Sequence, residues 1–112
     1  MSNPAKAKGS SAELAVKRYL ISEGTQCERI PAGAKNDIAD LWVPNLIWPT
    51  IDVKDHATLK LAEWVDRTAE QAHNAGRHAG IVWAKRRGKT NPADWYVITN
   101  GKQFTALMAG VK

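Results

Sequence analysis

The order of hydrophobic segments predicts an α/β domain, with a mixed five-stranded sheet flanked by helices. Two amphipathic helical patterns, at 10–23 and 58–75, alternate with strand-like segments, and a third helix is expected from Gly101. The apolar run at 80–84 lacks polar alternation, which is typical of a central strand covered on both faces. The predicted order is therefore helix, three strands, helix, two strands, helix.

Length and composition fit one domain with its own core. The chain has 112 residues, of which 44% are hydrophobic and five are tryptophan. The single cysteine, Cys27, excludes an internal disulfide and a cysteine metal cluster, and favours a reducing, cytoplasmic setting. We expect no contact with a membrane, because no apolar run is long enough to cross one. The net charge of +5 agrees with a nucleic-acid partner but is weak evidence alone.

The N-terminal part predicts an arm and a capped helix. Residues 1–9 are small, polar and basic, and are expected to form a flexible arm ahead of a single domain over 10–112. Ser10 and Glu13 fit a capping box, in which each side chain satisfies a free backbone amide at the start of a helix. The helix should then run to Glu23 and stop at Gly24.

Three strands are expected between the first two helices, and two of them form a hairpin over 38–54. Pro49 within the last strand implies a late start, a bulge or a sheet edge. Asp40 lies near the beginning of one arm and Asp52 near the end of the other. Because such positions face each other in an antiparallel pair, the two carboxylates should converge. The three strand segments are 26–30, 37–43 and 46–54.

The second half supplies a long helix, a central strand and a short terminal helix. The apolar face of the long helix runs from Leu59 through Leu61 and Trp64 to Ala72. A strand at 95–99 follows, and the last helix is expected to be anchored by apolar side chains. Core packing is the expected role of all five tryptophans, with base stacking a minority outcome. The anchors are Phe104, Leu107 and Met108, and the tryptophans are Trp42, Trp48, Trp64, Trp83 and Trp95.

The segment Ile51-Asp52-Val53-Lys54 carries the main chemical signal. As a strand it places Asp52 and Lys54 on one face, roughly 7 Å apart. Charges on an exposed strand face are common, and capping alone explains Glu13. Taken together, Asp40, Asp52, the Val53 carbonyl and Lys54 could hold a divalent cation and act on a phosphodiester.

An acid entering a strand, followed by a strand with (D/E)-x-K, resembles the PD-(D/E)XK nuclease motif. It stands here as Asn36-Asp37-Ile-Ala-Asp40-Leu-Trp-Val and Ile51-Asp52-Val53-Lys54. The wider order resembles the small Holliday junction resolvases of archaeal type and their phage and bacterial relatives, over roughly residues 9–99. This wider likeness rests on Gly9-Ser-Ser-Ala-Glu13, Arg29-Ile-Pro-Ala-Gly33, the long helix and Val82-Trp-Ala-Lys85.

The resemblance implies a restriction-endonuclease-like αβββαβ core and a homodimer that cuts four-way DNA junctions with Mg²⁺, or Mn²⁺ as a substitute. It implies metal ligation by Asp40, Asp52, Val53 and Glu13, with Lys54 as the catalytic lysine. Hydrolysis would leave a 5′-phosphate and a 3′-hydroxyl, in the host cytoplasm if the chain is phage-encoded. The family usually has glutamate where this chain has Asp52.

Two assignments stay open at this point. Asp40 is favoured as the first acid because it directly precedes the apolar strand, and Asp37 would then order the loop or lie in an outer shell. The loop from Lys85 to Lys89 is either a DNA contact or a solvated turn. The expected DNA-binding residues are Lys85, Arg86, Arg87 and Lys89, with Arg29 and Lys35 as a second group.

Two other functions compete with junction resolution. One is a nuclease of the same superfamily that acts on flaps, nicked duplex or genome ends. The other is a DNA-binding module that has kept the fold and lost the chemistry, for which the short Asp52 is the main support. Either form of the nuclease hypothesis predicts that Glu13, Asp40, Asp52 and Lys54 cluster in space.

Overall fold

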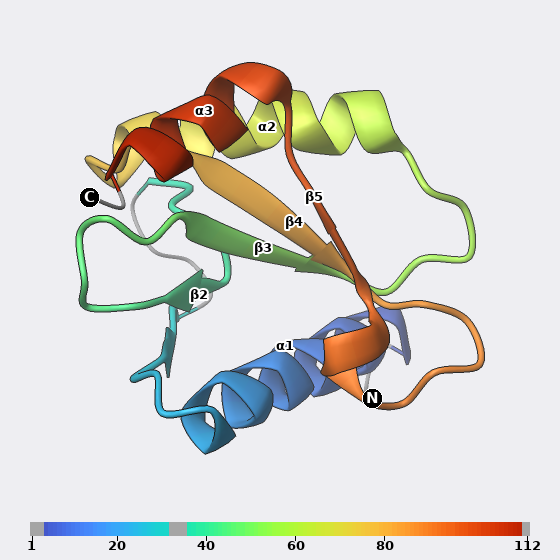
Figure 1. The fold of residues 1–112 in the computed structure, drawn as a ribbon. Helices are drawn as coiled ribbons and strands as arrows, with labels where there is room; N and C mark the ends of the chain where they lie inside the picture. The colour runs from blue at the N-terminus through green and yellow to red at the C-terminus, as the bar shows by residue number, and fades with distance from the viewer. Residues whose placement is uncertain (1–3, 32–35, 111–112) are drawn as a thin grey trace.

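The computed structural model describes residues 4–31 and 36–110, which form a mixed five-stranded sheet between helices (Figure 1). The strands lie in the order β1-β2-β3-β4-β5, which is also their order along the chain. The predicted α/β class and the predicted order of elements are confirmed. The strands are β1 (Glu28–Arg29), β2 (Leu41–Trp42), β3 (Thr50–Lys54), β4 (Gly80–Ala84) and β5 (Tyr96–Ile98). The helices are α1 (Pro4–Ser22), α2 (Leu61–Asn74), a short 3₁₀ turn η1 (Pro92–Asp94) and α3 (Gly101–Gly110).

The sheet is mixed because one of its four pairings is parallel. β1, β2 and β3 pair antiparallel, β3 and β4 pair parallel, and β5 returns antiparallel to β4. The hairpin predicted over 38–54 is present, with Leu41 opposite Ile51. Of the three alternatives that Pro49 left open, the structure shows a late start, since β3 begins at Thr50. Strands β3 and β4 are joined through α2, so both of their carboxyl ends lie at the same edge of the sheet.

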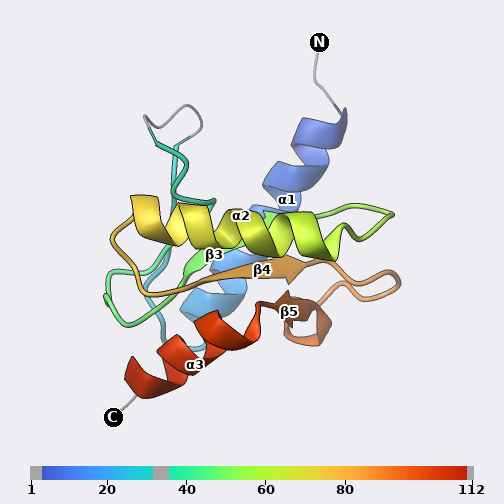
Figure 2. The same cartoon turned by 90° about the horizontal axis from the view of Figure 1, so that it is seen from above.

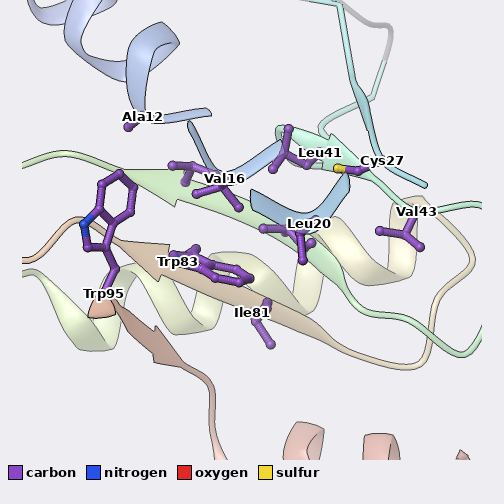
Figure 3. Close-up of a cluster of buried hydrophobic side chains, with 11 residues drawn as sticks. Ala12, Val16, Leu20, Cys27, Leu41, Val43, Ile81, Trp83 and Trp95 are labelled. Carbon is purple, nitrogen blue, oxygen red and sulfur yellow. The ribbon is translucent and has the colours of Figure 1, made fainter. Parts of the chain in front are cut away.

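Helices α1 and α2 cover opposite faces of the central strands (Figures 1 and 2). Toward α1 lies the larger core, in which Val16 and Leu20 pack against the sheet (Figure 3). Toward α2 lies a smaller cluster of Trp64, Val82 and Ala84. All five residues of β4 are buried, as expected for a central strand. The larger core also contains Ala12, Cys27, Leu41, Val43, Ile51, Val53, Ile81, Trp83 and Trp95.

The first helix begins earlier than the sequence pattern predicts. Residues from Pro4 to Gly9 are helical, so the flexible arm expected over 1–9 is wrong for these residues, while residues 1–3 lie outside the described part of the chain. Alanine and lysine are good helix formers, and a proline in the first turn lacks only an amide that has no helical partner. The capping box is also wrong, because Ser10 and Glu13 lie within the helix.

Several apolar side chains expected in the core are exposed. Leu59 and Leu61 precede or begin α2 and are exposed, as are the predicted anchors Phe104 and Met108. Trp42 lies on an outer face and is 40% exposed, so the expectation that all five tryptophans pack in the core is wrong for it. Helix α3 is held partly by a polar side chain, since buried Gln103 accepts a hydrogen bond from the Gly80 amide.

Arg77 is a buried cation that the sequence pattern did not reveal. Its guanidinium donates hydrogen bonds to the carbonyls of Val43, Asn45 and Trp48, and lies over the Trp42 ring at 5.5 Å. Burial lowers the pKa of this side chain. Arg77 therefore holds the connection between β2 and β3 in shape. Among the described residues, no helix is both long and apolar enough to cross a bilayer.

Gly80 is expected to tolerate no side chain. A Cβ atom there would lie 2.5 Å from the Thr68 carbonyl oxygen and 2.6 Å from Thr50 Oγ1. Gly80→Ala should therefore lower the free energy of unfolding by about 1–3 kcal/mol, measured by chemical denaturation. Gly9→Ala is the matched control, because no atom lies within 4 Å of the added carbon and the position is helical. An unchanged midpoint in Gly80→Ala would contradict this packing.

Candidate functional site

Asp40 enters the sheet where the loop after β1 meets β2. Its amide donates to the Ile51 carbonyl (3.0 Å), and its Oδ2 atom accepts a hydrogen bond from the Val53 amide (2.8 Å). The preceding residue, Ala39, is buried and has a φ of 80°. This left-handed conformation costs a residue other than glycine about 1–2 kcal/mol. The backbone before Asp40 is thus held in a specific turn that directs its carboxylate onto β3.

Asp52 is a buried carboxylate on the α2 face of β3. Ile51 and Val53 pack in the core toward α1, so strand alternation places Asp52 and Lys54 on the opposite face. Lys54 Nζ lies 3.3 Å from Asp52 Oδ2, which accepts no well-aligned hydrogen bond from the described residues. The predicted pairing of an acid and a lysine on one strand face is confirmed.

The two carboxylates converge strongly enough to change the protonation of Asp40. The pKa of Asp40 is raised to about 8, first by burial and then by the negative charge of Asp52, with a smaller contribution from Glu13. The hydrogen bond from the Val53 amide opposes this rise. Near neutral pH this pair therefore favours a bound positive charge, either a proton or a cation.

Lys54 is held in place from two sides. Its ammonium group lies against Asp52 and 5.9 Å from the centre of the Trp64 ring. Trp64 is buried on α2, so the core role predicted for it is confirmed, and it also contacts Lys54. The ring of His56 lies 5.2 Å from the Trp64 ring, and His56 is exposed.

A cavity of about 730 Å³ brings the predicted residues together. Its lining includes Glu13, Asp40, Asp52, Val53 and Lys54, so all five residues border one cavity. Glu13 lines the cavity from α1, and Asp40 and Asp52 line it from the hairpin. The cavity lies beside α2, from which Trp64, Arg67 and Gln71 also line it.

The donor set suits a hard cation such as Mg²⁺. Within residues 4–31 and 36–110, no three histidine, cysteine, aspartate or glutamate side chains are grouped closely enough to hold a metal by themselves. The Glu13 carboxylate forms an ion pair with the Arg29 guanidinium at 3.4 Å. Asp40 and Asp52 remain, with the Val53 carbonyl, which points to the same side of β3 as its amide and so toward Asp40. Two carboxylates and a carbonyl suffice for Mg²⁺, which keeps several waters.

Asp37 lines the same cavity, where its carboxylate is held by side chains of α2. Arg67 contacts its Oδ2 atom through Nε (2.9 Å) and a terminal nitrogen (2.8 Å). Gln71 donates to Asp37 Oδ1 (3.1 Å) and to Asp52 Oδ1 (3.3 Å), and so links the two acids. Asp37 is therefore bound by two side chains of α2, whereas Asp40 is bound by the backbone of β3. Gln71 was missed in the sequence, where a polar residue within the apolar face of a helix was the available signal.

Gln71→Glu is expected to destabilise the folded protein. The change replaces an amide donor between Asp37 and Asp52 by a third negative charge, at a position only 2% exposed. We expect a loss of about 1–3 kcal/mol at pH 7 in chemical denaturation. Gln26→Glu makes the same chemical change at an exposed position and should shift stability by less than about 0.5 kcal/mol. Equal effects of the two variants would contradict the bridging role of Gln71.

The residues expected to bind DNA are divided between two places. Lys85, Arg86, Arg87 and Lys89 are exposed on the loop after β4. Lys85 Nζ lies 3.9 Å from Asp55, and Arg86 lies over the Tyr96 ring at 5.7 Å. Arg29 is exposed in β1 but is engaged with Ser10 and Glu13. Lys35 lies outside the described residues.

Comparison with known proteins identified no family for this chain. Searches against protein-family models, curated proteins and solved structures found no significant match to the chain.

Proposed function

We propose that this protein is a metal-dependent, structure-selective DNA endonuclease that resolves four-way junctions by phosphodiester hydrolysis. The proposal includes a restriction-endonuclease-like αβββαβ core within the mixed sheet. The observation that carries it is the convergence of Asp40 and Asp52 beside Lys54, with the pKa of Asp40 raised to about 8. Two carboxylates can hold the divalent cation for phosphodiester hydrolysis, and a lysine beside them can stabilise the transition state.

Asp40, Asp52 and the Val53 carbonyl would hold Mg²⁺, or Mn²⁺ in its place. When bound, the cation polarises the phosphate, lowers the pKa of a bound water and neutralises charge at the leaving oxygen. Glu13 lines the same cavity and would contribute an outer ligand after release from Arg29. Asp52 is one methylene shorter than glutamate. It lies on a buried central strand close to Asp40, which supports direct ligation of the cation by its carboxylate.

Lys54 would act on the scissile phosphate itself. Its ammonium group is restrained by Asp52 and Trp64, so little reorganisation is needed before it orients the attacking water or stabilises transition-state charge. In-line attack would then leave a 5′-phosphate and a 3′-hydroxyl. The net charge of +5 and the exposed basic loop after β4 support a DNA partner, because phosphate contacts supply most DNA affinity. A homodimer would place two such sites on two opposing DNA strands of the junction.

A cleavage assay on three DNAs of equal length tests the proposal. The substrates are a synthetic four-way junction, a flap and a linear duplex, each with Mg²⁺ or Mn²⁺. We expect the junction to be cut at least about tenfold faster than the duplex, with 5′-phosphate ends. Equal rates on all three would favour a nuclease with another branched substrate. DNA binding that needs no metal, together with no cleavage under any metal, would favour a DNA-binding module and would overturn the proposal that the protein is a nuclease.

A further inference from the structure

A second cavity, of about 510 Å³, lies at the carboxyl ends of the two parallel strands. The segments that follow β3 and β4 line it, joined by Lys8 from α1 and Tyr96 from β5. In Figure 1 these two connections lie on the same side of the molecule, beyond the tips of the β3 and β4 arrows. Ligands of open α/β sheets bind characteristically outside the carboxyl ends of strands.

The charge of this cavity is strongly positive. Lys8, Lys85, Arg86 and Arg87 line it, against the single acid Asp55. The Asp55 carboxylate lies 3.7 Å from Lys8 Nζ and 3.9 Å from Lys85 Nζ, and its side chain is only 14% exposed. Asp55 therefore neutralises part of the cluster and holds two of its cations. The remaining excess of positive charge suits a phosphate group.

The same cavity also has an apolar and aromatic lining, which a free phosphate would not use. Tyr96 is 44% exposed and Leu59 is 43% exposed, both large apolar surfaces open to solvent beside the cations. The Arg86 guanidinium lies 5.7 Å from the Tyr96 ring centre, a typical arrangement for stacking an arginine on an aromatic ring. Cations next to an aromatic surface match a nucleotide, with its phosphate and its flat base.

The two cavities adjoin, because Asp55 and His56 line both of them. We propose that the second cavity binds one unpaired nucleotide of the DNA strand whose neighbouring phosphodiester enters the first cavity. This inference rests on the proposed function and deepens it. A base stacked within a duplex cannot enter a side cavity, whereas a base at a branch point or in a single strand can. The cavity would thus make the protein select branched DNA over uniform duplex.

Binding measured without divalent metal tests this site independently of cleavage. Fluorescence anisotropy in EDTA compares a fork carrying unpaired thymidines with a fully paired duplex of equal phosphate number. We expect the wild-type protein to prefer the fork at least fivefold. Arg86→Ala and Tyr96→Val should remove that preference, since base stacking contributes roughly five- to a hundredfold in affinity. Asp55→Asn should tighten fork binding, because it removes the negative charge in the cavity.

Matched variants separate the site from general effects. Tyr96→Phe keeps the ring and should keep the fork preference, and thermal unfolding of Tyr96→Val shows whether that variant is folded. Arg18→Ala removes an exposed positive charge on α1, outside both cavities, and should weaken fork and duplex equally. Equal wild-type affinity for the two DNAs, or equal weakening of both by Arg86→Ala and Tyr96→Val, would overturn the inference. Fork preference without cleavage under any metal would overturn the proposed nuclease and leave this site standing.

Discussion

Replacing Lys54 by alanine is expected to reduce junction cleavage by at least about 100-fold while leaving junction binding within about threefold. The reason is geometric, since Lys54 is the ammonium group that Asp52 and Trp64 hold at the cavity. Asp52→Asn should cause a loss of similar size, because it removes one of two carboxylates that would hold the cation. The measurement is a single-turnover cleavage rate with Mg²⁺, beside an anisotropy titration of the same junction.

Lys102→Ala is the matched control for Lys54→Ala, because Lys102 is exposed on α3 and lines neither cavity. Its cleavage rate should equal that of the wild-type protein. Thermal unfolding of each variant shows whether the fold survives loss of the pair between Lys54 and Asp52. Cleavage persisting in both Asp52→Ala and Lys54→Ala would defeat the assignment of this site.

Asp40→Asn is expected to make the protein more stable than the wild type at pH 8, with no difference near pH 4. The pKa of Asp40 rises from an ordinary 3.8 to about 8 on folding, mainly because of burial and then Asp52. Between these values the folded protein retains a proton that the unfolded chain releases, so the wild-type free energy of unfolding falls as pH rises. The slope contributed by Asp40 is at most about 1.4 kcal/mol per pH unit, and it levels off above pH 8.

The difference between the two proteins isolates this group, because every other titrating residue is common to both. Asparagine is isosteric, and its carbonyl oxygen can still accept the hydrogen bond from the Val53 amide. Chemical denaturation at intervals from pH 4 to pH 9 measures the effect. Parallel pH profiles for the wild type and Asp40→Asn would contradict a carboxylate held against Asp52.

Mg²⁺ should reverse this loss of stability in the wild type. A cation between Asp40 and Asp52 favours their ionised forms, so it should raise the melting temperature more at pH 8 than at pH 5. The rise should be absent in Asp40→Asn. An equal rise in the variant would indicate that Mg²⁺ binds elsewhere.

Local patterns in the sequence were enough to predict those features of the site that depend on a single strand or a single hairpin. Period-two alternation over 51–54 placed Asp52 and Lys54 on one face, because neighbouring side chains of any strand point to opposite sides. The two neighbouring strand patterns within 38–54 predicted the hairpin that brings Asp40 to β3. The wholly apolar run of 80–84 identified β4 as a central strand.

Tertiary structure decided which groups from distant segments meet. The sequence pattern marks Gln71 as a polar residue on an apolar helix face, but only the packing of α2 on β3 makes it the bridge between Asp37 and Asp52. It also decided that Phe104 and Met108 stay exposed and that α1 starts at Pro4. Periodicity reports which side of an element faces inward, whereas the partner on that side depends on the whole chain. The hairpin alone predicted that Asp40 and Asp52 converge, whereas the burial that contributes most to the raised pKa of Asp40 depends on the whole fold.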